Sequence, residues 1–254
     1  MNTEIISLVI FGCVVGAVLM GRMLSRRLPA DHLSADTKET VKLAMGLLAT
    51  MSALLLGLLV ASAKASYDNA RSEVIQMIAK VVFLDRVLTG YGPETAEART
   101  RLHEAVEETA HRMRPIRANT PVNLAPNTQA GNAIYLAIQH LTPNDDMQRS
   151  LKAQATTLAV ELGQLRTLLV AESISSISKP LLIVVACWLV VIFLSFSLIA
   201  PHNATATFAL MVSAVSVATA IFLILELDRP FSGLLRIPNE PMLNVLSQLE
   251  KSTQ

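Results

Sequence analysis

The densest group of side chains able to bind a metal or move a proton lies between residues 103 and 111. Its members are His103, Glu104, Glu107, Glu108 and His111. Glu108 and His111 have the Glu-x-x-His spacing of di-metal helical bundles, but such a site also needs a second pair and acids from other helices. The chain contains no second pair. We therefore interpret the group as a solvated helix face with surface ion pairs, and we expect no metal and no cofactor.

The sequence also lacks the local motifs of common catalytic sites. It has no Gly-x-Ser-x-Gly elbow, no Walker A loop, no Gly-x-Gly-x-x-Gly turn and no His-Glu-x-x-His pair. The net charge is only +1, and no run of Lys and Arg is interleaved with aromatic residues. We therefore expect neither an enzyme nor a nucleic-acid-binding protein.

Apolar residues dominate the chain and are grouped along it. Of the 254 residues 52% are hydrophobic and 16% are charged, and the mean hydropathy is +0.47. An α-helix needs about 20 apolar residues to cross a hydrocarbon core of about 30 Å. Four stretches of this kind (residues 5–21, 43–63, 181–203 and 204–225) lack Asp, Glu, Lys and Arg. They predict membrane spans at about residues 5–24, 42–64, 181–200 and 204–226, with membrane lipid as a partner.

A cleavable signal peptide is the alternative to the first span. The start of the chain, Met1 to Glu4, carries an acid and no Lys or Arg, unlike the basic start of a signal peptide. The Ala61-Ser62-Ala63 triplet does resemble a cleavage site. We favour an uncleaved span because a second apolar pair follows later in the chain.

The distribution of positive charge predicts the orientation in the membrane. The short connection from Arg22 to Lys42 is rich in Lys and Arg, and such loops lie on the cytoplasmic side. The N-terminus, the segment after the second span and the C-terminal tail are then predicted on the non-cytoplasmic side. The Pro201-His202 turn is predicted inside. The chain is thus expected to be a multi-pass membrane protein with a non-cytoplasmic soluble domain.

The two pairs of spans flank a helical soluble domain, which gives an all-α fold. We predict a first span pair in 1–64, an extramembrane helical domain in 65–179, a second span pair in 180–227 and a tail in 228–254. Apolar residues from Tyr67 to Leu88 recur every three or four positions. This spacing predicts that the second span continues beyond the membrane as one amphipathic helix.

Turn residues divide the rest of the soluble domain into further helices. Residues 90–93 (Gly-Tyr-Gly-Pro) predict the end of the long helix and the start of another. A helix is expected near 132–141. Thr142 and Pro143 then suit the N-cap and first position of a further helix. We expect that helix to lead into the third span, with a kink at Pro180.

Two segments carry a resemblance to a known family. They are Glu39 to Val74 (ETVKLAMGLLATMSALLLGLLVASAKASYDNARSEV) and Leu227 to Ile237 (LDRPFSGLLRI). The chain resembles the bacterial membrane proteins of the bestrophin-like domain family, and the resemblance covers most of its length. Bestrophins are pentameric anion channels in which two helices, a soluble helical region and two more helices follow one another. The resemblance implies a homo-oligomeric ion channel of the bacterial inner membrane, with inorganic ions, anions first, as ligands.

Helical spacing along the second span aligns small side chains in what we call the small-residue stripe. It consists of Gly46, Thr50, Ala53, Gly57 and Ala61 and continues to Lys64 and Asp68. Small residues let helices approach closely, so one interpretation is packing within the chain. Lys64 and Asp68, spaced four apart, could then simply pair with each other. The other interpretation of the stripe is a pore lining repeated around an oligomer axis, with Thr50 and Ser52 giving polar contacts and Lys64 or Arg71 attracting anions at the outer mouth. Since four packed helices enclose no aqueous hole, this second interpretation requires a ring of copies.

Two further segments also carry alternative interpretations. Gly12 and Gly16 form a GxxxG pair, which predicts a contact either with a helix of the same chain or with another subunit. The segment after the fourth span contains Asp228, Arg229, Pro230, Phe231 and Gly233. It is either an interfacial turn whose phenyl ring lies in the headgroup region, or a gate that folds back over a pore mouth.

Two functions therefore compete. The first is an oligomeric ion channel with its pore along the second span. The second is a non-conducting scaffold or envelope sensor that acts through its extramembrane helical domain. A proton relay or ion-coupled transporter is disfavoured, because no charged residue lies deep within a predicted span.

Overall fold

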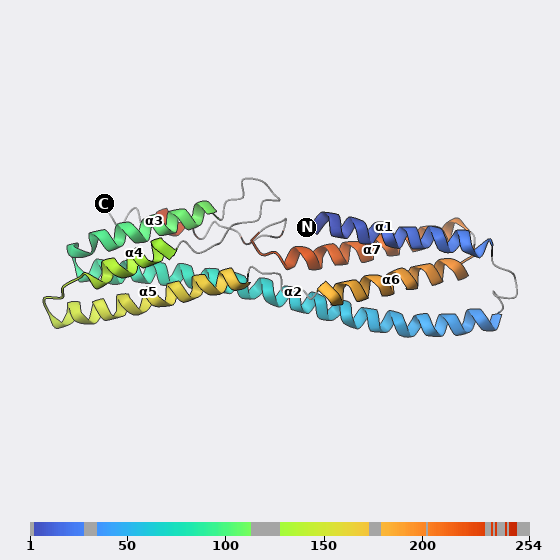
Figure 1. Ribbon diagram of the computed structural model, residues 1–254, viewed down its shortest axis with the longest axis horizontal. Coiled ribbons are helices and arrows are strands. Elements are labelled where there is room, and N and C mark those ends of the chain that lie inside the picture. Colours follow the sequence, from blue (N-terminus) through green and yellow to red (C-terminus); the bar gives the residue numbers. More distant parts are fainter. Residues whose placement is uncertain are drawn as a thin grey trace. The chain divides into compact units, whose positions relative to one another are not determined.

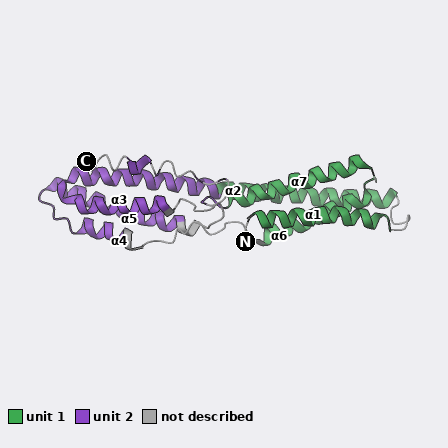
Figure 2. Ribbon diagram, turned by 90° about the horizontal axis from the view of Figure 1, so that it is seen from above, with its two compact units in different colours: residues 1–65, 176–228 green, residues 66–175, 229–254 purple. Residues whose placement is uncertain are grey.

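The computed structural model describes residues 3–27, 35–112, 128–172, 179–201, 203–231, 235, 237, 242 and 244–247. Every regular element in these ranges is a helix, which confirms the all-α prediction (Figure 1). The chain divides into two compact units (Figure 2). The first contains residues 1–65 and 176–228, and the second contains residues 66–175 and 229–254.

The first unit is built from long apolar helices. They are α1 (Thr3–Ser25), α6 (Lys179–Ile199), α7 (Ala204–Leu227) and the first part of α2 (Ala35–Tyr91). All four helices are long and apolar enough to cross a membrane, as the sequence predicts. The start of α7 is fixed by Asn203, whose side chain accepts a hydrogen bond from the Ala206 N–H at 2.8 Å.

Most of the apolar surface of the first unit is exposed. Its core includes Val18 of α1, Val185 of α6 and Ile221 of α7, each fully enclosed. Yet only 33%, 11%, 28% and 22% of the apolar segments of α1, α2, α6 and α7 are buried. Exposed apolar area of this extent is unfavourable in water, so lipid or further protein must cover it.

α1 and α6 approach each other closely at Gly21. A Cβ built on Gly21 would lie 2.7 Å from the Leu194 carbonyl oxygen and 2.9 Å from the Ser197 Cβ. One turn earlier, the buried Ser197 hydroxyl donates a hydrogen bond of 2.5 Å to the Val18 carbonyl. Small residues thus bring these two helices together, at a glycine other than the GxxxG pair that the sequence highlights.

The second unit packs the remainder of α2 with three shorter helices. They are α3 (Ala96–Arg112), α4 (Thr128–Gln139) and α5 (Asp146–Glu172), preceded by the 3₁₀ helix η2 (Pro93–Thr95). Leu84 and Leu88 of α2, Leu102 of α3 and Ile138 of α4 lie in the core. Since α2 is unbroken from Ala35 to Tyr91, the predicted continuation of the second span is confirmed.

The turn after α2 follows the sequence prediction. Gly92 has a φ of 132°, which side-chain-bearing residues rarely adopt, and Pro93 opens the next helix. The Thr95 hydroxyl donates to the Leu88 carbonyl at 2.7 Å and so satisfies a group at the end of α2.

One helix start differs from the prediction. The cap of α5 is Asp145 instead of Thr142, because the Asp145 carboxylate accepts the Gln148 N–H at 2.6 Å. The kink predicted at Pro180, the second described residue of α6, stays a prediction. Residues 173–178 lie outside the described residues.

The segment after α7 contributes to the core of the second unit. Met242 and Val245 are 2% and 6% exposed and belong to the same hydrophobic cluster as Leu84 and Leu88. From the sequence we predict only a tail for this segment, although Met242, Val245, Leu246 and Leu249 recur every three or four positions. The structure therefore adds a packing role for it.

Candidate functional site

The small-residue stripe lies on the exposed side of α2. All seven of its residues are exposed: Gly46, Thr50, Ala53, Gly57, Ala61, Lys64 and Asp68. A Cβ built on Gly46 or Gly57 would meet nothing within 4 Å. The side of α2 that packs into the first unit instead carries Ser52, Leu59 and Ala63, at 2%, 2% and 0% exposure. The two glycines therefore do not serve close helix packing within the described chain.

The polar residues near the stripe face different ways. The exposed Thr50 hydroxyl donates to the Leu47 carbonyl at 2.8 Å. The Ser52 hydroxyl donates to the Leu48 carbonyl at 2.8 Å, and its side chain is buried. The expectation that Ser52 joins Thr50 in a pore lining is therefore wrong, because residues two apart lie on opposite sides of a helix.

A leucine ridge runs beside the stripe. Its most exposed members are Leu43, Leu47, Leu54 and Leu58, at 73%, 66%, 75% and 58% exposure. The free surface of α2 thus has two parts, a line of small side chains and a line of large apolar ones. Large apolar side chains suit contact with lipid or another subunit, whereas small ones leave open space in front of the helix.

The GxxxG pair of α1 is also exposed. A Cβ built on Gly12 or on Gly16 would meet nothing within 4 Å. The interpretation that this pair packs against a helix of the same chain is therefore wrong for the described residues. Its glycines are available to lipid or to another subunit.

The segment after α7 is held by protein contacts. Asp228 ends α7, and its N–H donates to the Ile224 carbonyl at 3.2 Å. Pro230 is buried, and its carbonyl accepts the Ile237 N–H at 2.8 Å. Phe231 is partly buried and packs against the core of the second unit, and its role as a headgroup anchor stays a prediction.

Other members of this motif are less informative. Arg229 is partly buried between Asp228 and Pro230. Gly233 lies outside the described residues. The backbone freedom that the gate interpretation requires of Gly233 therefore stays a prediction.

Within the group of acids and histidines on α3, Glu107 and His111 pair at the surface, whereas His103 Nε2 is buried. His111 Nε2 lies 3.7 Å from Glu107 Oε1, and both side chains are more than half exposed. Within the part of the chain that the structure describes, no group of three or more His, Cys, Asp or Glu side chains could hold a metal ion.

Comparison with known proteins identifies the family. The bestrophin-like domain matches residues 12–242, from within α1 to Met242 of the second unit. No curated protein and no solved structure matches the chain. With this match over most of the chain and four apolar helices that can span a bilayer, the chain is a membrane protein that belongs to the bestrophin-like family.

Proposed function

We propose that this protein is an oligomeric ion channel, selective for anions, whose pore is lined by the small-residue stripe of α2. The observation that carries the proposal is that the stripe is exposed along its whole length in the single chain. Membership of a family known for channels rather than enzymes gives it independent support.

The shape of the exposed α2 surface suits a ring of copies. Small side chains at Gly46, Ala53 and Gly57 would leave open space at the axis. The neighbouring leucine ridge would fill the contact between adjacent subunits or face lipid. The exposed pair of Gly12 and Gly16 on α1 supplies a second surface where helices of different subunits can approach closely.

Charge at the C-terminal end of the stripe would favour anions. Lys64 is exposed there and follows the apolar stretch directly. A ring of such ammonium groups raises the local anion concentration at a pore mouth. With the orientation that positive charge in the 22–42 loop favours, this mouth faces the non-cytoplasmic side.

The segment from Asp228 to Phe231 is proposed as the gating element. Asp228 ends a spanning helix, while Phe231 packs in the core of the second unit. Because Asp228 and Phe231 are three residues apart in the chain, a rearrangement of that core would displace the end of α7.

Reversal potential and subunit number test the proposal together. The protein is purified into lipid nanodiscs for native mass spectrometry and fused into planar bilayers under asymmetric KCl. A closed oligomer with discrete currents that reverse near the chloride potential is the expected result. Lys64→Glu should move the reversal potential toward that of potassium, whereas Arg149→Glu on α5, a charge reversal off α2, should not. A monomer, or currents reversing at the potassium potential, contradicts the proposal.

A non-conducting scaffold or envelope sensor is the second candidate function. The observation that favours it is that the second unit has a hydrophobic core and a cavity of its own. An oligomer that stays silent across voltage, pH and calcium would support this function over the channel.

A further inference from the structure

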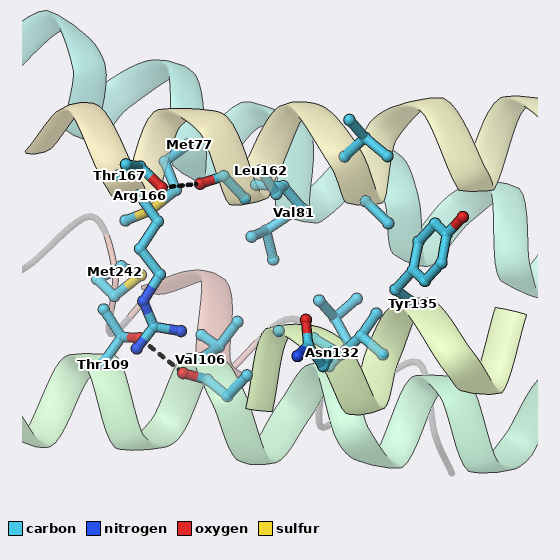
Figure 3. Close-up of a pocket in the computed structure, with 17 residues that line it drawn as sticks. Met77, Val81, Val106, Thr109, Asn132, Tyr135, Leu162, Arg166, Thr167 and Met242 are labelled. Carbon is cyan, nitrogen blue, oxygen red and sulfur yellow. Dashed lines mark hydrogen bonds between the residues drawn. The ribbon is translucent and has the colours of Figure 1, made fainter. Parts of the chain in front are cut away.

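A half-open cavity of about 340 Å³ lies in the second unit, between α2, α3, α4 and α5 (Figure 3). Its walls are mostly apolar. The larger apolar side chains around it are Met77, Val81, Leu102, Val106, Ile134 and Leu162, and Met242 closes it from the segment after α7. Close-packed interiors contain few voids larger than a water molecule, so a space of this size is a binding-site candidate.

One charged side chain enters this apolar space. Arg166 extends from α5 across the cavity toward Thr109 and Val106 of α3 (Figure 3). Among the described residues that line the cavity, Arg166 is the one charged residue, and none is a carboxylate. The lining thus offers a ligand one cationic group, which also has an interaction within the protein.

The other polar groups of the lining are arranged around the same space. The Thr109 hydroxyl donates to the Ala105 carbonyl at 2.7 Å, and the Thr167 hydroxyl to the Gly163 carbonyl at 2.9 Å (Figure 3). Both hydroxyls donate within their own helices and keep their oxygen lone pairs as acceptors. Asn132 and Tyr135 add polar groups from α4.

We propose that this cavity binds a small amphipathic carboxylate, with its carboxylate on Arg166 and an unbranched aliphatic tail among the apolar walls. A guanidinium presents several N–H donors in a planar fork, so it can hold a carboxylate in two parallel hydrogen bonds while keeping other contacts. The apolar walls shield the tail from water, which a purely inorganic anion would not require. This site is separate from the α2 stripe and does not depend on conduction.

Calorimetry with octanoate and octanol tests the proposal. The full-length protein in nanodiscs is titrated with each compound, and empty nanodiscs are titrated to subtract partition into lipid. Octanoate should bind saturably, and octanol, which lacks the charge, should bind about tenfold or more weakly. Arg166→Gln should reduce octanoate affinity to the level of octanol without changing octanol binding. Arg149→Gln on the same helix, outside the cavity, should change neither.

Filling the cavity provides the second arm. Gly163 lines it, and a Cβ built there meets nothing within 4 Å, so Gly163→Leu should fit and abolish binding of both compounds. If that variant does not fold, Gly131→Leu on α4 replaces it, because a Cβ built on Gly131 also meets nothing within 4 Å. Four results would each overturn the proposed site. They are equal affinity for octanoate and octanol, unchanged octanoate binding in Arg166→Gln, retained binding in a folded variant with the cavity filled, and no saturable binding. None of these results bears on the channel.

Discussion

At Gly21 the absence of a side chain sets how closely α1 and α6 pack. Gly21→Ala places a methyl group 2.7 Å from the Leu194 carbonyl, so one helix must shift. We expect a loss of about 1–3 kcal/mol in the free energy of unfolding, the usual cost of overpacking. Thermal unfolding in detergent, followed by Trp188 fluorescence, measures it. Gly12→Ala, where the added Cβ meets nothing, is the control, and equal effects of the two changes would contradict the account.

Tyr91 gives the second residue-scale prediction, because burial raises the pKa of its hydroxyl, and the Glu94 and Asp145 carboxylates raise it further. An unfolded tyrosine titrates near pH 10. The folded state holds the proton more tightly, so this contribution to stability is fully present below about pH 10. It is lost as the pH rises through the folded pKa.

Tyr91→Phe should remove this part of the alkaline destabilisation. The Tyr91 hydroxyl is buried and has no hydrogen-bond partner among the described residues, so at pH 7 the change should cost less than about 1 kcal/mol. Urea unfolding at pH 7 and at about pH 11 distinguishes the outcomes. An unchanged slope of stability against pH in the variant would argue against a role for Tyr91.

Two ion pairs join α2 to its neighbours and differ in burial. Arg99 Nε of α3 lies 2.9 Å from Asp85 Oδ1, with side-chain exposures of 16% and 8%, whereas Lys80 and Glu161 are 30% and 40% exposed. Arg99→Leu leaves a buried carboxylate and should cost about 3 kcal/mol or more. Lys80→Met should cost less than about 1 kcal/mol. Resistance of the second unit to limited proteolysis reports the difference, and a reversed order would refute this ranking.

At the scale of elements, the helices could be predicted because their signals are local. The apolar stretches, the glycines at the end of α2 and the three-four spacing in its second half each act within a few residues. The cap of α5 was harder, because Thr142 and Asp145 are both good caps and only packing selects between them.

Features that depend on distant residues could not be predicted in this way. The approach of Gly21 to Leu194 and the packing of Met242 in the same core as Leu84 join segments far apart in the sequence. One feature of the sequence could have indicated the cavity, because Arg166 interrupts the apolar side of α5 one turn after Leu162. The stripe, in contrast, could be predicted from spacing alone, but its exposure could not.

For the whole molecule, the first prediction concerns orientation in the membrane. Positive charge in the 22–42 loop predicts that this loop is cytoplasmic and that the second unit is not. In a Cys13→Ala, Cys187→Ala background, Lys42→Cys should react with an impermeant thiol reagent only after cells are opened. Arg101→Cys, exposed on α3, should react in cells whose outer membrane alone is permeabilised. The opposite pattern would reverse the orientation and move Lys64 to the inner mouth.

The central claim is that the small-residue stripe of α2 faces water inside a ring of subunits. Thiol reactivity under current recording tests it most directly, because a thiol in lipid does not form the reactive thiolate. In the background without Cys13 and Cys187, a charged thiosulfonate should reduce the current through Gly57→Cys channels and leave Ser52→Cys channels, buried within the subunit, unchanged. A current through Gly57→Cys that the reagent does not alter would show that the stripe does not line the conducting path.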